Sequence, residues 1–269
     1  MIFDIDNLCK NNLILRFKFR QNNEKKKFSF LKSKHSREIY SCPLSNHFYS
    51  LHNYDIEKIY SGEYNEINYR NKLGIRNEFN KIINLPKDNS DNKNRIANLS
   101  SYFDALKHED FRVLDVGSGI GVFPFEMKRI GWNIEAVDPD KNSVNHLEEI
   151  LKVKCHHCFF QELYLKQKYD LITFNKVIEH VKNPLSFLLF SKNLLNLGGY
   201  IYIEVPDGVQ ASQIGKDRNE FALEHFHAFS IRSTAALIAQ SGFSALRIER
   251  LIEPSGKFTI RAIAKLNAY

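Results

Sequence analysis

The chain has 269 residues, of which 43% are hydrophobic and 26% charged, enough for one well-cored domain with an appendage or for two small domains. No apolar run reaches the roughly 18–20 residues that span a bilayer. Acidic residues stand near the N-terminus where a signal peptide has basic ones, so we expect a cytoplasmic protein with no membrane partner. The four cysteines are too few for a disulfide scaffold, and we expect reduced thiols.

The net charge of +7 is confined to the N-terminal part of the chain. Residues 1–100 carry 18 basic and 11 acidic side chains, whereas residues 101–269 carry 20 of each. Enzymes that act on nucleic acid usually line the catalytic groove with positive charge, because phosphate contacts supply much of their affinity. The neutral second part therefore disfavours a nucleic-acid partner. The basic first part is interpreted either as a solvated surface or as a surface for an anionic small molecule or another partner.

Residues 1–89 form a predicted N-terminal appendage of mixed α and β structure. Apolar and basic residues alternate over residues 13–19, which predicts a strand, and residues 28–31 are a candidate second strand. Farther along, tyrosines recur at spacings mostly compatible with a helix: Tyr49, Tyr54, Tyr60, Tyr64 and Tyr69. They are interpreted as packing residues or as part of a substrate lid. The polar residues 87–94 follow Pro86 and predict a linker.

A second domain is predicted over residues 90–269, where strand-like and helix-like patterns alternate. Ser90 or Asp91 is placed to cap a helix that runs through residue 106. The predicted strands are residues 112–116, 133–137, 154–159, 170–174 and 200–205, and the predicted helices are residues 123–130, 143–151, 184–195 and 231–241. This alternation indicates a parallel sheet between two helical layers, and a final hairpin of residues 244–251 and 257–265 makes the sheet mixed.

The most informative segment is VLDVGSGIGVF at residues 113–123, where an apolar strand enters a loop with glycine at alternate positions. Glycine there lets a ligand approach the backbone, and the following helix presents unpaired N–H groups. The dinucleotide fingerprint requires G-x-G-x-x-G, but Val122 occupies its last glycine position. Asp115, just before the loop, repels a pyrophosphate and suits a ligand with a cationic amine. The segment therefore disfavours a nicotinamide-dependent dehydrogenase.

A second acidic residue, Asp138, ends the next predicted strand, 17 residues after Gly121. A carboxylate at that position accepts hydrogen bonds from both hydroxyls of a ribose. Together with Asp115 and the glycine loop, it predicts a site for a nucleoside that carries positive charge.

These motifs resemble those of the class I S-adenosylmethionine-dependent methyltransferases over residues 112–265. The match includes VLDVGSGIG, Asp138, the segment YDLITFNKVIEHV at residues 169–181 and the segment LLNLGGYIYIEVP at residues 194–206. The resemblance implies a Rossmann-like three-layer α/β sandwich. Its mostly parallel seven-stranded sheet would have the order 3-2-1-4-5-7-6, with the last strand antiparallel. It also implies that S-adenosyl-L-methionine binds at the carboxyl ends of the strands.

The same resemblance assigns cofactor contacts to individual residues. Those that would line the methionine or ribose side are Asp115, Gly117, Ser118, Gly119, Gly121, Asn175 and Lys176. Asp138 would bind the ribose hydroxyls, with Pro139 against the adenine. Phe160 or Gln161 would border the adenine, and Gln161 or Glu162 would contact its amino group.

Methyl transfer to a hydroxyl group normally needs a general base, and histidine suits that role near neutral pH. The candidates are His180, after the fourth predicted strand of this domain, and His225 and His227, after the fifth. The segment EHFHAFS at residues 224–230 resembles a loop that closes over the substrate in a subgroup of sugar and other small-molecule methyltransferases. A structural role is the alternative for each histidine.

We predict no metal site. Glu179, His180 and Asp207 have the chemistry of metal ligands, but their spacing does not require an ion. The sequence CHHC at residues 155–158 alternates between strand faces and cannot converge on one zinc ion. Residues 42–45, CPLS, resemble a zinc knuckle that has lost its second cysteine.

The leading functional hypothesis is O-methylation of a small polar acceptor such as a sugar, a nucleotide-sugar or a phosphorylated metabolite, with cell-surface polysaccharide as one destination. The alternatives are C- or N-methylation of a small molecule and a catalytically silent cofactor-binding scaffold. Methylation of a base amino group is disfavoured, because the motif NKVI at residues 175–178 replaces the Asn/Asp-Pro-Pro-aromatic motif of those enzymes. The sequence does not predict an oligomeric state.

Overall fold

The computed structural model describes residues 12–20, 36–52, 72–106 and 108–267. The candidate strand at residues 28–31 and four of the five recurrent tyrosines, Tyr54, Tyr60, Tyr64 and Tyr69, lie outside these ranges. Within them, no helix combines the length and the apolar character needed to cross a lipid bilayer.

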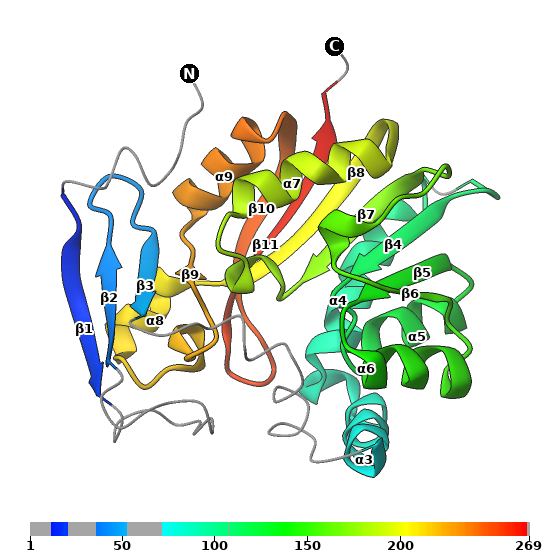
Figure 1. Ribbon diagram of the computed structural model, residues 1–269, viewed down its shortest axis with the longest axis horizontal. Helices are drawn as coiled ribbons and strands as arrows, with labels where there is room; N and C mark the ends of the chain where they lie inside the picture. The colour runs from blue at the N-terminus through cyan, green and yellow to red at the C-terminus, as the bar shows by residue number, and fades with distance from the viewer. Residues whose placement is uncertain (1–11, 21–35, 53–71, 107, 268–269) are drawn as a thin grey trace.

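The main sheet has seven strands in the order β10-β11-β8-β7-β4-β5-β6 (Figure 1). Its parallel strands are β4 (Arg112–Val116), β5 (Asn133–Asp138), β6 (Cys155–His157), β7 (Tyr169–Asn175) and β8 (Leu195–Pro206). β11 (Phe258–Leu266) is antiparallel to both its neighbours, β8 and β10 (Phe243–Ile252). The predicted strand order and the terminal hairpin are confirmed.

Helices cover both faces of the main sheet and complete three layers (Figure 1). One face packs against α7 (Pro184–Ser191) and α9 (Ile231–Gln240). The other packs against α4 (Asp91–Phe103) and α5 (Val122–Arg129). Side chains of a strand alternate between faces, so Val113 joins the α4–α5 layer while Leu114 joins the α7–α9 layer. This is the predicted three-layer sandwich.

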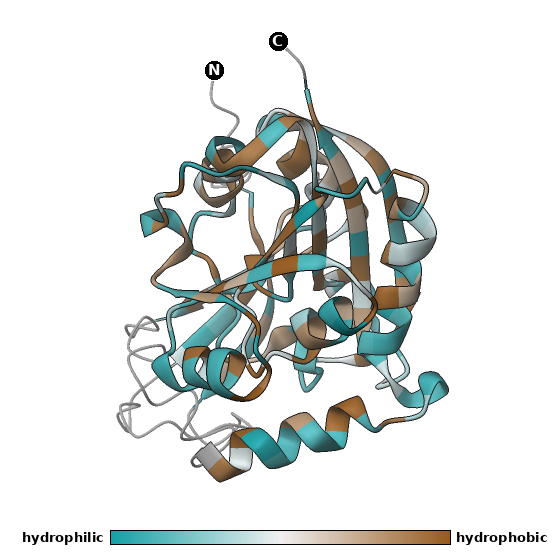
Figure 2. Cartoon of the chain, turned by 90° about the vertical axis from the view of Figure 1, so that its right-hand side faces the viewer, coloured by the Kyte–Doolittle hydropathy of each residue, from teal (hydrophilic) through white to brown (hydrophobic). Residues whose placement is uncertain are grey.

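Helix α3 (Lys72–Ile83) is an element that the sequence did not predict. Its hydrophobic residues alternate with hydrophilic ones, as Figure 2 shows for the helix at the bottom of the molecule. Ile75 and Phe79 are buried in one cluster with Leu147 and Val153. This helix therefore packs on the catalytic region, although it lies within the predicted appendage.

The capped helix before the glycine loop is confirmed, and Ser90 is its N-cap. The Ser90 Oγ accepts a hydrogen bond from the Lys93 backbone N at 3.2 Å. Residues 87–94 are therefore not a linker, because a short 3-10 turn at Lys87–Asn89 leads directly into α4. Two further short helices are α6 (Lys141–Asn145), which continues as a π turn through His146–Ile150, and α8 (Gly208–Ile214).

A second, four-stranded sheet joins three strands from the first part of the chain to one short strand from the loop after β8. Its order is β1 (Ile14–Arg20), β2 (Ser36–Ser41), β3 (Phe48–His52) and β9 (His227–Ala228). β1 confirms the predicted first strand, whereas β9 comes from the loop that follows β8. We call this the N-terminal sheet. Its core includes Phe19 and Ile39 together with Phe221, so the N-terminal strands and the later loop share one hydrophobic cluster.

The cysteines differ in state. Cys155 and Cys158 are free thiols, as expected, but Cys42 is disulfide-bonded, so the expectation of reduced thiols is wrong at that position.

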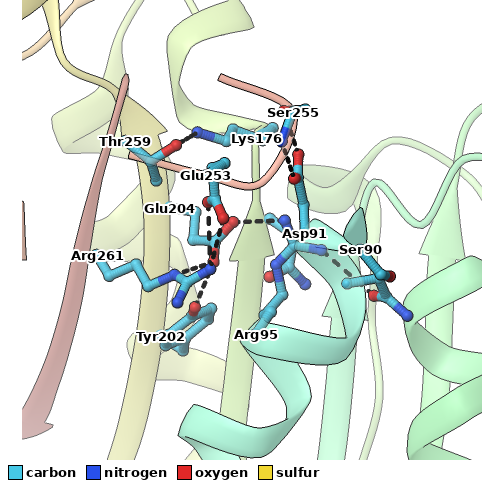
Figure 3. A network of polar contacts seen from close by, with 12 residues as sticks. Ser90, Asp91, Arg95, Lys176, Tyr202, Glu204, Glu253, Ser255, Thr259 and Arg261 are labelled. Atoms are coloured by element: carbon cyan, nitrogen blue, oxygen red, sulfur yellow. Dashed lines mark hydrogen bonds and ion pairs between the residues drawn. The ribbon is translucent and has the colours of Figure 1, made fainter. Parts of the chain in front are cut away.

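A network of buried charges connects α4 to the strands β8 and β11 (Figure 3). The Glu204 carboxylate forms ion pairs with Arg95 at 2.5 Å and with Arg261 at 2.7 Å. It also accepts a hydrogen bond from the Tyr202 hydroxyl at 2.5 Å. Arg261 also pairs with Glu253 at 3.0 Å. Burial opposes the charge on Glu204, but the two guanidinium groups hold the pKa of that carboxyl well below its usual range. The network fixes α4, which precedes the glycine loop, against the far side of the sheet.

Replacing Glu204 with glutamine should lower the free energy of unfolding by about 3–5 kcal/mol, because it leaves buried guanidinium charge uncompensated. Equilibrium unfolding in urea measures this loss. The matched control is Glu249→Gln, which removes the half-buried, solvent-accessible pair with Arg247 and should cost about 0–1 kcal/mol. Equal losses in the two variants would contradict a special role for the buried network.

Candidate active site

The loop between β4 and α5 holds its glycines in the left-handed backbone region, with φ of 66° at Gly117, 52° at Gly119 and 80° at Gly121. A Cβ at Gly117 would meet Val177 at 2.7 Å, and one at Gly121 would meet Leu147 at 2.6 Å, so these two glycines permit close packing. A Cβ at Gly119 would meet nothing within 4 Å. Gly119 is therefore the point in the loop where a ligand can approach the backbone.

Asp115 ties the end of β4 to β7 and to the glycine loop. Its Oδ1 accepts hydrogen bonds from Thr173 Oγ1 at 2.6 Å and from Asn175 Nδ2 at 2.8 Å. Its Oδ2 accepts one from Ser118 Oγ at 2.7 Å. The carboxyl is almost fully buried, and burial raises its pKa to about 6, against the hydrogen bonds that favour the charged form. Asp115 thus sets the shape of the site as well as its charge.

Asp138 closes the other side of the loop at the end of β5. Its Oδ2 accepts a hydrogen bond from the Gly119 backbone N at 2.8 Å, and its Oδ1 accepts one from the Asp140 backbone N at 2.9 Å. Burial raises the pKa of this carboxyl to about 7, although both backbone hydrogen bonds favour ionisation. A ligand that reaches the open face of Gly119 is therefore expected to meet the Asp138 carboxyl as well.

The predicted adenine-side residues differ in exposure. Pro139 is half-buried beside Asp138, and Gln161 is exposed. Phe160 is buried, and its ring packs against Phe174 and Phe187 in the core, with ring centroids 5.5 and 4.8 Å apart. An adenine contact is therefore better supported for Gln161 than for the ring of Phe160.

Asn175 ends β7 and Lys176 follows it, but their side chains have different surroundings. Asn175 donates to Asp115, while its Oδ1 is buried and has no hydrogen-bond partner among the described residues. Lys176 has a left-handed backbone, with φ of 60°, and its Nζ donates to Thr259 Oγ1 at 2.6 Å (Figure 3). Burial lowers the pKa of Lys176. Asn175 therefore offers an acceptor to a ligand, whereas Lys176 extends toward β11.

The residues at the carboxyl ends of β4, β5 and β7 fit the nucleoside predicted from the sequence. The open face of Gly119 leaves room for it, and the Asn175 Oδ1 is an unused acceptor that suits an ammonium group. Two carboxyl groups, Asp115 and Asp138, flank the loop, a charge that repels a pyrophosphate and attracts a cation. This donor set suits S-adenosylmethionine.

Two of the three candidate histidines lie together. His180 is in the 3-10 turn Ile178–His180 after β7, and its Nδ1 donates to the Glu224 carbonyl at 3.1 Å. The His225 Nδ1 donates to the Glu220 carbonyl at 2.9 Å. Because a carbonyl can only accept, Nδ1 of each ring carries a proton, and the neutral ring of His225 keeps its lone pair on Nε2. The ring centroids of His180 and His225 are 4.8 Å apart, at 82°.

Glu179 completes this cluster. One polar atom from each of Glu179, His180 and His225 lies within 4.8 Å of the others. Glu179 is buried, its Oε2 has no hydrogen-bond partner among the described residues, and burial raises its pKa. Burial, with the neighbouring His180, lowers the pKa of His225 to about 3. In this cluster burial therefore disfavours the charged forms of both Glu179 and His225, and the neutral imidazole of His225 keeps an acceptor nitrogen.

The alternative metal set with Asp207 is not formed. The Asp207 Oδ1 accepts the backbone N–H groups of Val209 and Gln210 at the start of α8, and its carboxylate pairs with Arg250.

His227 occupies a different environment, inside the N-terminal sheet. Its Nδ1 lies 3.0 Å from His47 Nε2, and its Nε2 lies 3.4 Å from the Lys182 carbonyl. His47 continues the chain of hydrogen bonds to Ser233 Oγ at 3.1 Å. His227 is buried, and burial lowers its pKa to about 4. Both ring nitrogens are used within the protein, which favours a structural role for His227.

Sequence reasoning gave Glu179 only a possible metal role, considered His47 only as a ligand in a zinc site with too few ligands, and gave Arg37 no role. Glu179 adjoins His180 in sequence, so an indication was available for it. His47 is hydrogen-bonded to His227, 180 residues later in the sequence, and Arg37 is hydrogen-bonded to the Phe221 carbonyl, 184 residues later. Such separations leave no local pattern from which either contact could be inferred.

The fold and the site define a class I S-adenosylmethionine-dependent methyltransferase. In agreement, the family model described as "Methyltransferase domain" matches residues 76–248, and the chain belongs to that family.

Curated relatives resemble parts of the chain. It is 32% identical over 103 residues to a ubiquinone biosynthesis O-methyltransferase of Glaesserella parasuis serovar 5, covering 34% of this chain and 44% of the relative. It is 28% identical over 163 residues to a protein of the same name from Bordetella avium, covering 54% of this chain and 63% of the relative. The chain thus spans less than two thirds of the length of either relative.

Solved structures share the fold at low sequence identity. Magnesium protoporphyrin IX methyltransferase of Synechocystis PCC 6803, with bound S-adenosylhomocysteine, has a TM-score of 0.59 at 14% identity and covers 79% of this chain and 100% of its own. The 1,6-didemethyltoxoflavin-N1-methyltransferase of Burkholderia thailandensis has a TM-score of 0.56 at 14% identity and covers 89% of this chain and 98% of its own.

The raised pKa values of the two site carboxyls predict that cofactor binding depends on pH. In the free protein Asp138, with a pKa of about 7, and Asp115, with a pKa of about 6, take up protons as the pH falls through that range. Hydroxyl donors and a cationic ligand favour the ionised carboxylates, so binding should release protons. We expect affinity for S-adenosylmethionine to rise with pH up to about 8, by at most about tenfold per unit for each coupled proton.

Calorimetry at pH 6 and pH 8, in two buffers of different ionisation enthalpy, measures the protons released on binding. In Asp138→Asn the release near pH 7 should disappear. Linkage also requires the ligand-free protein to lose stability as the pH rises through 6–7, because these folded-state pKa values exceed the unfolded ones. A pH-independent affinity would contradict the prediction.

Proposed function

We propose that the chain is an O-methyltransferase for a small polar molecule, and that His225, with His180 beside it, accepts the proton of the acceptor hydroxyl. The observation that carries the proposal is the hydrogen bonding of the two imidazoles to backbone carbonyls. The carbonyls of Glu224 and Glu220 lie 3.1 and 2.9 Å from the Nδ1 atoms of His180 and His225, and the Nδ1 proton of His225 leaves its Nε2 able to accept a proton.

The proposed site places this pair next to the cofactor residues, because the turn that carries His180 begins three residues after Asn175. S-adenosylmethionine supplies a methyl group on a positively charged sulfur. The acceptor oxygen forms a bond to the methyl carbon, the carbon–sulfur bond breaks, and the sulfur keeps that electron pair. The hydroxyl proton passes to His225 Nε2 and then to water. The protein contributes mainly orientation, with proton acceptance as a second contribution.

Within this proposal, Asp115, Asp138, Asn175 and the glycine loop bind the cofactor, and no metal ion takes part. In place of a metal ion, the positive charge of Lys176 lies near Glu179 and favours the ionised form of its carboxyl. The neutral charge balance of residues 101–269 supports a small molecule as the acceptor and gives no support to a nucleic acid. The proposal keeps the division at residues 89 and 90 and a cytoplasmic location.

The names of the curated relatives support oxygen as the acceptor atom. None of the comparisons supports a carbohydrate acceptor in particular. The acceptor panel should therefore contain intermediates of ubiquinone biosynthesis as well as sugars, nucleotide-sugars and phosphorylated metabolites. Release of S-adenosylhomocysteine identifies a substrate, and NMR of the product locates the new methyl group.

The outcomes of this screen distinguish the alternatives. Methyl ether formation supports the proposal, whereas methylation at nitrogen or carbon replaces it with the corresponding transferase. A catalytically silent cofactor-binding scaffold would bind S-adenosylmethionine in calorimetry but release no S-adenosylhomocysteine with any acceptor of the panel. If the chain binds no cofactor, the site assignment itself is wrong.

A further inference from the structure

The side chain of Arg37 reaches from β2 into the loop that carries His225. It is 1% exposed, and its guanidinium lies 4.0 Å from the centroid of the Phe19 ring. Its Nη2 donates to the Phe221 carbonyl at 3.0 Å, and its Nη1 is 3.3 Å from the Ala222 carbonyl. A buried guanidinium is costly unless its N–H groups are hydrogen-bonded, so this loop conformation and Arg37 depend on each other.

The carbonyls held by Arg37 belong to the turn that orients His225. The Ala222 carbonyl accepts from the His225 backbone N at 3.1 Å as well as from Arg37. The ring of His225 is fixed by the Glu220 carbonyl, at 2.9 Å from Nδ1. The carbonyl groups of one turn thus accept hydrogen bonds from the side chain of Arg37 and from the backbone and ring of His225.

The third strand of the N-terminal sheet holds the same loop at two more points. The His52 Nε2 is 3.1 Å from the Leu223 carbonyl, and the Ser50 backbone N donates to the Phe226 carbonyl at 2.8 Å. On the opposite side, the Phe226 backbone N donates to the Glu179 carbonyl at 2.8 Å. The segment around His225 is therefore held between the N-terminal sheet and the turn that carries Glu179.

We propose that Arg37 is a positioning residue for His225, and that the N-terminal sheet is for this reason a working part of the methyl-transfer site. The inference rests on the proposed function, in which His225 accepts a proton. Arginine is needed because its planar guanidinium presents several N–H groups at fixed angles and can bind adjacent carbonyls together. A lysine ammonium group at the same position is a point charge and would hold fewer of the carbonyl groups in place.

The test uses the full chain saturated with S-adenosylhomocysteine and reads the tautomer of His225 from long-range ¹⁵N–¹H spectra of its imidazole. In the wild type we expect the proton on Nδ1. In Arg37→Met the turn loses its side-chain donor, and we expect a mixture of tautomers, with Arg37→Lys in between. In Arg37→Ala, added guanidinium should restore the wild-type spectrum. His156 and His157, on β6, should not change in any variant.

The matched control is Arg16→Met, because Arg16 lies on the same sheet but donates to Ser41 within it, at 2.8 Å. With an acceptor from the screen, Arg37→Met should lower kcat by about 100-fold, the usual cost of a misplacement of about 1 Å, and leave KM for S-adenosylmethionine unchanged.

An unchanged His225 spectrum in Arg37→Met and Arg37→Ala would overturn the proposal, as would the same change in Arg16→Met. If Arg37→Met does not fold, Arg37→Lys and the guanidinium titration of Arg37→Ala decide. Failure of the proposed function is separate, because it appears as absent binding of S-adenosylhomocysteine, or as methylation at an atom other than oxygen, by the wild type.

Discussion

Replacing Asp138 with alanine should weaken the binding of S-adenosylhomocysteine by at least about 100-fold. The carboxylate at the end of β5 is expected to accept both ribose hydroxyls, and hydrogen bonds to a charged group contribute about 1.5–3 kcal/mol each. A loss of about 3 kcal/mol corresponds to a factor of more than 100 in the dissociation constant. Isothermal titration calorimetry on the wild type and the variant measures this ratio directly.

The control for this substitution is Asp110→Ala, which removes an exposed carboxyl shortly before β4 and should leave affinity unchanged. The thermal midpoint of ligand-free Asp138→Ala shows whether the variant is folded. If folded Asp138→Ala binds with wild-type affinity, the ribose lies elsewhere and the site assignment fails.

Replacing His225 with alanine should lower kcat by about 10²–10⁴-fold, the usual contribution of a positioned general base. Binding of S-adenosylhomocysteine should be unchanged, because no cofactor contact is assigned to His225. The measurement is steady-state turnover with an acceptor from the screen, combined with calorimetry. The pKa of about 3 keeps this imidazole neutral, so turnover should not fall near pH 6.5 through protonation of His225.

His227→Ala provides the contrast, since His227 occurs in the same sequence segment but lies inside the N-terminal sheet. Loss of its hydrogen bonds to His47 and to the Lys182 carbonyl should destabilise the chain by about 1–3 kcal/mol. Its kcat below the unfolding temperature should fall much less than that of His225→Ala. The reverse order of the two kcat values would assign proton acceptance to His227.

The main sheet and the cofactor side of the site could be predicted because their causes are local in sequence. Strands such as β4 and β7 are buried on both faces and therefore appear as nearly continuous apolar runs. The glycine loop needs left-handed backbone angles, which restrict residue type strongly. Asp115 and Asp138 follow from their places at strand ends. These motifs also support the resemblance to class I methyltransferases, and that resemblance implied the strand order.

The acceptor side could not be predicted to the same degree, because its geometry depends on contacts between distant segments. β9 has two residues, too few for a periodic pattern, and it exists only by pairing with β3. The sequence placed His225 and His227 in one loop segment, but the ring of His225 packs against that of His180, whereas His227 lies in the N-terminal sheet. α3 was missed because its weak amphipathic pattern depends on the surface of α5 and the π turn for burial.

The pairing of β3 with β9 also has an evolutionary consequence. A segment exchanged between related enzymes brings its own side chains to the positions that contact His227, which in this chain are Tyr49, paired with it across the two strands, and His47, hydrogen-bonded to its ring. A chimera made at the boundary before α4 would thus place foreign partners against the loop of His225. Acceptor preference should therefore be inherited through compatible pairs of segments, one from before α4 and one from the loop after β8. Grafting either segment alone should yield a folded cofactor-binding core with impaired transfer.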